Sequence, residues 1–425
     1  MSTIDKKKIS ERAAEVLREN DRGTYTVPTK GLYPFQWNWD SCLTALGLAQ
    51  IDERRAWQEI ETLFEHQWDD GMVPHIVFHQ HDDGYFPGPD VWETNRPVPT
   101  SGITQPAVAG FAVKRLFDRA RDTRLAREKA SALLPKITKW HEWFYENRDP
   151  ARTGLVAIIH PWESGRDNSI DWDDAFERVP TEGVQAYQRR DLSHANPDHR
   201  PTQEQYDRYI WLVQKFRSLQ WDNSKLHDAS PFQIVDPGFN GILIRDCQET
   251  AELAEALGKD EIAALNRQWA ANGLAALDTL WSEKYQQFVC YDRAAAKLVD
   301  SASIGGLLAV FAHVSKAQAE TIAARINDLA QRAKFLVPSH DPIDPRFDGK
   351  RYWRGPAWLI VNYMIADGLI RAEQTETANR IVSSSLDLIL ESGFAEYYDP
   401  IDGEPCGGSR FTWTAAMVLE FLREL

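Results

Sequence analysis

Two carboxylic acids stand among aromatic residues in loops that are far apart in the chain. Asp167 follows a short apolar stretch in Ile159-His-Pro-Trp-Glu-Ser-Gly-Arg-Asp-Asn168, and Glu396 lies within Phe394-Ala-Glu-Tyr-Tyr-Asp-Pro400. Burial and a like-charged neighbour raise the pKa of a carboxyl group, so that one such acid stays protonated near pH 7. Glycosidic cleavage needs one acid of this kind and one carboxylate that acts as base or nucleophile. Since no nucleotide-binding or Ser/His/Asp motif competes, the pair predicts a glycoside hydrolase.

A third aromatic segment carries a further carboxylate. In Tyr33-Pro-Phe-Gln-Trp-Asn-Trp-Asp40 the chain approaches a predicted helix, and Asp40 either caps that helix or reaches into a pocket. Trp37 and Trp39 are two residues apart, so an extended segment would direct both rings to one face. The segment is therefore interpreted as part of a sugar site, with a hydrophobic plug as the alternative.

The Pro- and Gly-rich segment Asp83-Gly-Tyr-Phe-Pro-Gly-Pro-Asp90 is interpreted as a rigid loop that exposes Tyr85 and Phe86. Three histidines lie near it, His75, His79 and His81, but no HExxH motif or helical i, i+4 pair accompanies them. We therefore interpret them as surface or loop histidines. The sequence predicts neither a metal nor an organic cofactor.

Two further loops combine arginine with aromatic rings. Arg200 belongs to a basic loop at 189–202 in an acidic chain, and Tyr206 follows on a predicted helix. Because a guanidinium binds a carboxylate through two parallel hydrogen bonds, Arg200 is suited to hold an anionic group. An ion pair with a surface aspartate is the alternative. The other loop, Arg351-Tyr-Trp-Arg-Gly-Pro-Ala-Trp358, runs into a helix.

The elements that must position these loops are helical along nearly the whole chain. Apolar residues recur at i, i+3, i+4 and i+7 in 9–17, 304–311 and 418–425. Pro135 should kink or interrupt one helical stretch. The other helices are predicted at 39–52, 54–67, 104–121, 123–148, 204–220, 236–257, 260–283, 316–332, 357–371 and 374–391, and two short strands at 155–159 and 288–291.

Long aromatic loops separate about twelve helices that follow one another in pairs. This pattern predicts an all-α fold, an (α/α)6 barrel with long aromatic-rich loops and a lid at one end. A solenoid would repeat at a fixed length, and these pairs do not. No Pro/Ser-rich linker interrupts the chain, so residues 1–425 are expected to form a single catalytic domain, with a lid or insert region at about 149–235.

The acidic composition excludes several kinds of partner. Lys and Arg number 48 against 63 Asp and Glu, which leaves a formal net charge of −15; such a surface disfavours nucleic acid and anionic membranes. No apolar run approaches the ~20 residues of a membrane span, and the N-terminus lacks the apolar core of a secretory signal. We therefore expect a cytoplasmic protein with a small-molecule partner, and the pattern leaves homo-oligomer formation open.

Eight motifs, taken in order along the chain, resemble glycoside hydrolase family 63, in particular its compact bacterial branch of mannosylglycerate and glucosylglycerate hydrolases. They are Tyr33-Pro-Phe-Gln-Trp-Asn-Trp-Asp40, Gly71-Met-Val-Pro-His75, Tyr85-Phe-Pro-Gly88, Gly102-Ile-Thr-Gln-Pro106, Trp162-Glu-Ser-Gly-Arg-Asp-Asn168, Arg200-Pro-Thr202 with Tyr206, Tyr352-Trp-Arg-Gly-Pro356 with Trp358, and Glu396-Tyr-Tyr-Asp-Pro400. The eukaryotic glucosidases of this family carry an N-terminal β domain. This chain begins at the helical module, so we expect a small substrate.

The resemblance implies an (α/α)6 barrel and an inverting mechanism, with Asp167 as the general acid and Glu396 as the general base. It implies a sugar subsite formed by Tyr33, Trp37, Trp39, Asp40, Gln105, Trp353 and Trp358. It implies a glycerate end formed by Tyr85, Arg200, Tyr206 and Tyr352. The segment 183–205 is expected to be a mobile lid over the pocket.

Residues and resemblance together predict hydrolysis of a small α-glycoside of glycerate to free sugar and glycerate. An inverting enzyme should hold its two carboxyl groups about 6.5–9.5 Å apart, whereas a separation near 5 Å would indicate retention. One alternative is an α-glucosidase or α-mannosidase acting on a neutral disaccharide or short oligosaccharide. The others are a sugar epimerase, which would use paired histidines as acid and base, and a sugar-binding protein without activity.

Overall fold

Helices make up most of the structure, as the hydrophobic periodicity predicts. The computed structural model describes residues 3–191 and 196–424, and this part of the chain contains sixteen α-helices. They are α1 (Thr3–Asn20), α2 (Asn38–Ala49), α3 (Glu53–Phe64), α4 (Pro89–Trp92), α5 (Ala109–Asp118), α6 (Thr123–Asn147), α7 (Asp173–Glu177), α8 (Gln203–Ser218), α9 (Asn223–Ala229), α10 (Pro237–Ala256), α11 (Asp260–Leu277), α12 (Ile304–Leu308), α13 (Lys316–Leu329), α14 (Leu359–Arg371), α15 (Thr375–Ser392) and α16 (Thr412–Glu424). None of these helices is long and apolar enough to cross a lipid bilayer.

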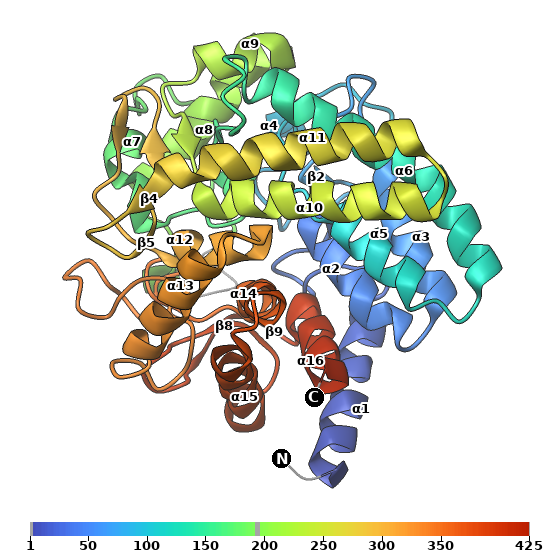
Figure 1. The fold of residues 1–425 in the computed structure, drawn as a ribbon. Coiled ribbons are helices and arrows are strands. Elements are labelled where there is room, and N and C mark those ends of the chain that lie inside the picture. Colours follow the sequence, from blue (N-terminus) through green and yellow to red (C-terminus); the bar gives the residue numbers. More distant parts are fainter. Residues whose placement is uncertain (1–2, 192–195, 425) are drawn as a thin grey trace.

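Six helical segments are buried along most of their length: α2, α5, α10, α12 with the 3-10 turn η6 (Ala309–Ala312), α14 and α16. Each packs against an outer partner, in the order α3, α6, α11, α13, α15 and α1. The buried segments also contact one another in succession, and α16 contacts α2. The last helix therefore lies beside the first ones, and both chain ends lie on the same side of the molecule (Figure 1).

Several helix boundaries differ from those expected. The helix expected at 104–121 begins only at Ala109, because residue 105 precedes Pro106 and is thereby disfavoured from helical geometry. The helix expected at 260–283 ends at Leu277 and gives way to a hairpin. The stretch 304–311 is divided between α12 and η6, whereas α6 runs without interruption through Pro135.

Nine short strands accompany the helices in the described part of the chain, so the fold is not purely helical. They are β1 (Gln36–Trp37), β2 (Ile76–Val77), β3 (Ile234–Val235), β4 (Trp281–Ser282), β5 (Gln287–Phe288), β6 (Tyr291–Asp292), β7 (Lys297–Leu298), β8 (Ala395–Tyr398) and β9 (Pro405–Ser409). They pair antiparallel as β1–β2, β3–β6–β7, β4–β5 and β8–β9. Of the two predicted strands, 155–159 provides one isolated bridge, from Ile158 to Ile234, and 288–291 is divided between β5 and β6.

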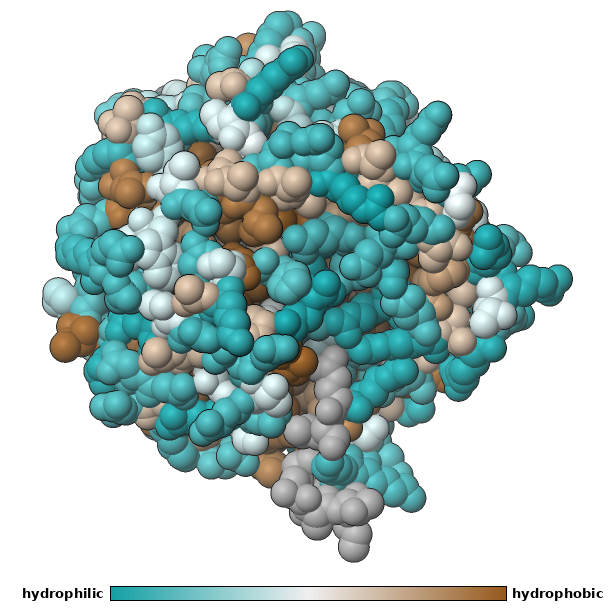
Figure 2. Space-filling model, viewed as in Figure 1, coloured by the Kyte–Doolittle hydropathy of each residue, from teal (hydrophilic) through white to brown (hydrophobic). Residues whose placement is uncertain are grey.

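Hydrophilic residues predominate on the face shown in Figure 2, and the hydrophobic residues there form small separate groups. Ile343 is the most exposed of the large hydrophobic side chains, at 74%. The apolar residues are otherwise concentrated in one core cluster that runs from α1 to α16. This distribution is typical of a surface that faces water.

The crossing of α2 and α16 provides a test of the packing. A Cβ added at Gly47 would lie 2.6 Å from the Cα and 2.8 Å from the Cβ of Ala416. Because both atoms belong to a helix that cannot move independently, we expect Gly47→Ala to lower the free energy of unfolding by about 1–3 kcal/mol. Urea denaturation measures this loss. Gly84→Ala is the matched control, because Gly84 is exposed and its added Cβ would meet only the flexible Asp82 carboxylate. An equal loss in both variants would contradict the close approach.

Candidate active site

A cavity opens where loops lead into the buried helices, with Trp39 and Asp40 at the start of α2, Gln105 before α5 and Trp413 at the start of α16. The sequence-predicted residues that line it are Tyr33, Trp37, Trp39, Asp40, Tyr85, Gln105, Asp167, Arg200, Tyr206, Tyr352 and Glu396. The loops therefore converge as the sequence predicts.

Trp353 and Trp358 do not line this cavity. Their rings stack on each other 3.8 Å apart, and the side chains are 1% and 0% exposed. Trp358 also packs edge-on against Tyr352 and stacks on Tyr397. The two tryptophans thus support the wall from behind, because an aromatic loop fills a core as readily as it lines a pocket.

Asp167 reaches the cavity from a tight turn. The turn follows the 3-10 helix η1 (Pro161–Ser164) and passes through Gly165, whose φ of +69° is left-handed and where a Cβ would lie 2.6 Å from the Trp39 ring. The carbonyl oxygen of Asp167 accepts hydrogen bonds from Tyr209 Oη and Trp172 Nε1, both at 3.1 Å. Burial raises the pKa of the Asp167 carboxyl to about 7; the Arg200 charge opposes this shift and the Glu396 charge adds to it. The group is therefore protonated below that pH.

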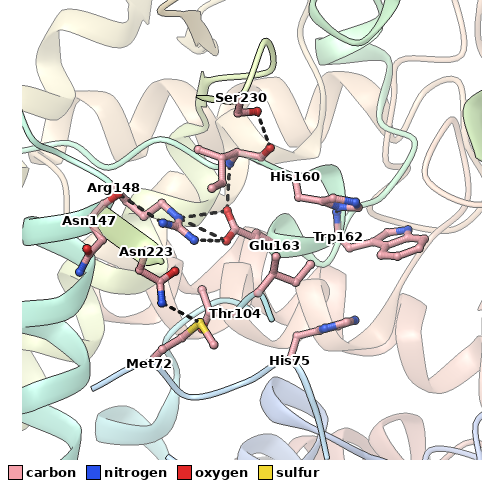
Figure 3. Close-up of polar contacts among 12 residues, drawn as sticks. Met72, His75, Thr104, Asn147, Arg148, His160, Trp162, Glu163, Asn223 and Ser230 are labelled. Carbon is pink, nitrogen blue, oxygen red and sulfur yellow. Dashed lines mark hydrogen bonds and ion pairs between the residues drawn. The ribbon is translucent and has the colours of Figure 1, made fainter. Parts of the chain in front are cut away.

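Glu163, the neighbouring carboxylate, has a different environment. Figure 3 shows it paired with Arg148, whose Nη2 donates to Glu163 Oε1 at 2.7 Å. The backbone N–H of Ile159 donates to Glu163 Oε2 at 2.9 Å. This buried pair does not line the cavity, and it ties the loop that leads to Asp167 to the end of α6.

Glu396 lies on β8 and is 1% exposed. Tyr33 Oη donates to its Oε1 at 3.1 Å, and the backbone N–H of Gly408 donates to its Oε2 at 2.9 Å. At Gly407, where φ is +71°, a Cβ would lie 2.2 Å from this carboxylate, so strand β9 leaves no space for a larger residue there. Burial raises the pKa of Glu396, but the Arg200 charge and both hydrogen bonds favour the ionised form.

Arg200 is a buried cation at the pocket, 5% exposed. Its Nη1 donates to Tyr33 Oη at 3.1 Å, its Nε donates to Asp191 Oδ2 at 3.3 Å, and its guanidinium lies 4.3 Å from the centre of the Tyr352 ring. The predicted alternative, an ion pair with aspartate, is therefore present, but in the pocket wall rather than on the surface. Of the expected lid at 183–205, residues 192–195 lie outside the described part of the chain.

Asp40 does not cap its helix. The residue at the cap of α2 is Trp37, which ends β1, while Asp40 lies in the first turn with its carboxyl group at the cavity. Trp39 is already helical, so Trp37 and Trp39 do not share one face of an extended segment as predicted. The backbone N–H of Trp39 donates to Gln105 Oε1 at 3.3 Å. Burial, together with the Glu396 charge, raises the pKa of Asp40 well above its usual range.

His75 is a cavity residue that the sequence interpretation missed. It is 5% exposed, and its Nδ1 lies 2.7 Å from Ser101 Oγ. Burial lowers its pKa well below the usual range, so the ring is neutral. Its position in the motif Gly71-Met-Val-Pro-His75, quoted for the family resemblance, was the available signal. His81 is exposed, as expected of a loop histidine.

Two further tryptophans line the cavity. Trp162 stands in the motif that contains Asp167, and Trp413 comes from the first turn of α16, for which no sequence signal was present. Among the residues of 3–191 and 196–424, no group of three His, Cys, Asp or Glu side chains is arranged to hold a metal ion.

Comparison with known proteins identifies the family. The sequence profile described as mannosylglycerate hydrolase MGH1-like glycoside hydrolase domain matches residues 33–414. Mannosylglycerate hydrolase MGH1 of Selaginella moellendorffii is 44% identical over 422 residues, which cover 99% of this chain and 86% of the relative. Glucosylglycerate hydrolase of Mycolicibacterium hassiacum is 34% identical over 437 residues, which cover 97% of each chain.

A solved structure shows the same fold. The family 63 mannosylglycerate hydrolase from Thermus thermophilus, in complex with Tris and D-glycerate, matches with a TM-score of 0.94 at 44% identity, over 97% of this chain and 99% of that one. Profile, relatives and structure agree over nearly the whole length. The chain therefore belongs to the family of mannosylglycerate hydrolase MGH1-like glycoside hydrolases.

Proposed function

We propose that this protein hydrolyses a small α-glycoside of glycerate, mannosylglycerate or glucosylglycerate, with inversion at the anomeric carbon. The observation that carries the proposal is one aromatic-lined cavity that holds Asp167, Glu396 and the buried cation Arg200 together. The names of the relatives and the D-glycerate in the Thermus structure support the same substrate class.

The surroundings of the two carboxyl groups support different roles. Asp167, with a pKa raised to about 7, keeps its proton below that pH and is present in both forms near neutrality; it is the proposed general acid. Glu396 accepts hydrogen bonds from Tyr33 and Gly408, which favour its ionised form, and is the proposed general base. Inversion requires a separation of about 6.5–9.5 Å, with an attacking water beside the base. This separation stays a prediction.

Arg200 supports a site for the glycerate carboxylate, with the phenols of Tyr85, Tyr206 and Tyr352 around it. A protein with a net charge of −15 repels an anion unless a local cation compensates. Tyr33, Trp37, Trp39, Asp40 and Gln105 then form the sugar subsite. In this assignment Trp353 and Trp358 keep the wall rigid rather than touch the sugar.

The architecture belongs to the same proposal. The succession of contacts among the six buried segments supports a closed (α/α)6 barrel formed by one domain over residues 1–425. The region 149–235 is the insert, and 183–205 is the lid that excludes bulk water during the reaction. Within the lid, Asp191 is paired with Arg189 and Arg200. Arg200 in turn donates a hydrogen bond to Tyr33 Oη, and this contact between the lid and the pocket wall supports the role.

The same ion pair favours a second candidate function. Asp191 already compensates the charge of Arg200, and such a pair would suit an uncharged aglycone. An α-glucosidase or α-mannosidase that acts on a neutral disaccharide is therefore the alternative.

A hydrolysis panel tests the function. We expect kcat/KM for glucosylglycerate or mannosylglycerate to exceed that for glucosylglycerol, which lacks the carboxylate, by at least ~100-fold, a difference of about 2.7 kcal/mol. Proton NMR of the fresh product should show the β-anomer first, because an α-glycoside is inverted. Equal rates for the neutral glycoside would favour the second candidate, and an initial α-anomer would contradict the inverting mechanism.

Arg200→Ala tests the carboxylate site. Loss of a charged hydrogen-bond donor should raise KM for the glycerate glycoside about 10- to 100-fold while KM for glucosylglycerol changes less than about threefold. Steady-state kinetics on the two substrates measures the difference. Arg208→Ala is the control, because Arg208 bonds Glu204 and backbone carbonyls outside the cavity. Equal effects of Arg200→Ala on both substrates would remove Arg200 from the carboxylate role.

The pH profile tests the two carboxyl groups. Because the pKa of Asp167 is raised to about 7, its proton is present at lower pH and lost above it, so kcat/KM should fall above about pH 7. On the acid side, activity should fall as Glu396 takes up a proton, at a pH above the usual range of a glutamate. Asp167→Asn, assayed with an α-glycosyl fluoride that needs no proton donor, should lack the upper limb. Persistence of that limb would assign it to another group.

A further inference from the structure

The side chain directly before the proposed acid turns away from the cavity. Arg166 is 2% exposed and absent from the cavity wall, although its neighbours Gly165 and Asp167 line it. Its Nη1 donates to Ser303 Oγ at 3.0 Å, and its Nη2 is paired with Asp236. Successive side chains of the turn therefore differ in their surroundings: Arg166 enters a buried polar cluster and Asp167 lines the cavity.

The partners of Arg166 begin two of the buried helical segments. Asp236 caps α10, where Oδ1 accepts from the N–H of Gly238 at 2.8 Å, and Ser303 caps α12, where Oγ accepts from the N–H of Gly305 at 3.1 Å. One guanidinium thus links the turn to two helix N-termini. A Cβ at position 305 would lie 2.2 Å from Nη2, so the cluster has no spare space.

Asp171 completes this cluster. Although it stands in an acidic stretch of the sequence, Asp171 is 3% exposed and accepts a hydrogen bond from Ser303 Oγ. The charge of Arg166 is balanced by Asp236 and Asp171, whereas the charges that act on Asp167 are those of Arg200 and Glu396. Arg166 therefore influences the acid through its position rather than through its charge.

The other side of the acid is held as well. Asn168 Oδ1 accepts from the backbone N–H of Trp353 at 2.9 Å. The carbonyl of Asp167 is held by Tyr209 and Trp172. With these bonds the backbone on both sides of Asp167 is anchored, while no hydrogen bond from another side chain to its carboxyl group is found among the described residues. The orientation of the acid consequently depends on its neighbours.

We propose that Arg166 is a positioning residue: by binding Asp236 and Ser303 it fixes the turn 165–168 so that the Asp167 carboxyl group points at the oxygen of the leaving group. The inference rests on the proposed function, in which Asp167 is the acid. A displacement of about 1 Å in a reacting group costs on the order of 100-fold in rate. The expected loss therefore lies in proton donation and not in substrate binding.

The experiment compares two substrates that differ in their need for a proton. Glycerate is a poor leaving group and requires the acid, whereas the fluoride of an α-glycosyl fluoride departs with little help. Arg166→Met should lower kcat for the glycerate glycoside about 100-fold, with KM within about threefold, and should lower kcat for the fluoride less than about fivefold. Arg166→Lys keeps part of the ion pair and should restore about tenfold of the loss.

Controls separate positioning from general destabilisation. Arg245→Lys disturbs another buried arginine, paired with Glu249 and Asp367 away from the cavity, and should lower Tm without changing the ratio of the two activities. Ser303→Ala keeps the Arg166–Asp236 pair and removes the hydrogen bonds of Ser303 Oγ with Arg166, Asp171 and the N–H of Gly305. It provides a folded variant in case Arg166→Met does not fold, and it should lower kcat for the glycerate glycoside alone, by about 3- to 10-fold.

Three results would overturn the inference or its basis. If Arg166→Met or Ser303→Ala lowers both activities by the same factor, or lowers neither, Arg166 is not a positioning residue for the acid. If Asp167→Asn is selective for the glycerate glycoside and the Arg166 variants are not, only this inference is wrong. If Asp167→Asn itself loses both activities equally, the proposed acid is wrong, and the inference is overturned with it.

Discussion

Asp167, Glu396 and Arg200 are ionisable groups held in a cavity walled by aromatic rings, where little water is available to solvate their charges. Burial raises the pKa of both carboxyl groups, and Arg200 opposes that shift at both. The number of hydrogen-bond donors then distinguishes the two carboxyl groups. Glu396 receives hydrogen bonds from Tyr33 and a backbone N–H, whereas among the described residues the ionised form of Asp167 is favoured only by its own backbone and by the charge of Arg200. The proposed division into base and acid follows from this asymmetry.

Such groups keep their places only if the chain around them is rigid. The buried pairs Arg148–Glu163 and Arg166–Asp236 anchor the turn that carries Asp167, and both pairs lie outside the cavity. Glu396 is held differently, by the short β8–β9 sheet and by Gly407 and Gly408 of β9, which lie against its carboxylate. These two ion pairs thus compensate their charges outside the cavity, while the groups that line it come from a loop, a strand and the first turn of a helix.

The limits of sequence reasoning show at particular residues. The prediction places too many residues in the cavity at Trp353 and Trp358, and too few at His75. The motif that contains the two tryptophans predicts a pocket, but their rings stack in the core. His75 is predicted to be a loop residue, but it is buried at the cavity. Residue type and spacing indicate which side chains come near a site. They do not record which side of a wall each one occupies, because that depends on how the segments pack.

By itself the sequence determined the helical class, most helix positions, the family resemblance and the loops that meet at the cavity, because periodicity and motif spacing are local properties of the chain. The tertiary structure alone decided the burial of Arg200 and the anchoring of Arg166 on α10 and α12. These features join segments that are far apart in the sequence. The energies of these contacts depend on the distance between segments and on the exclusion of water, and neither is a property of one segment alone.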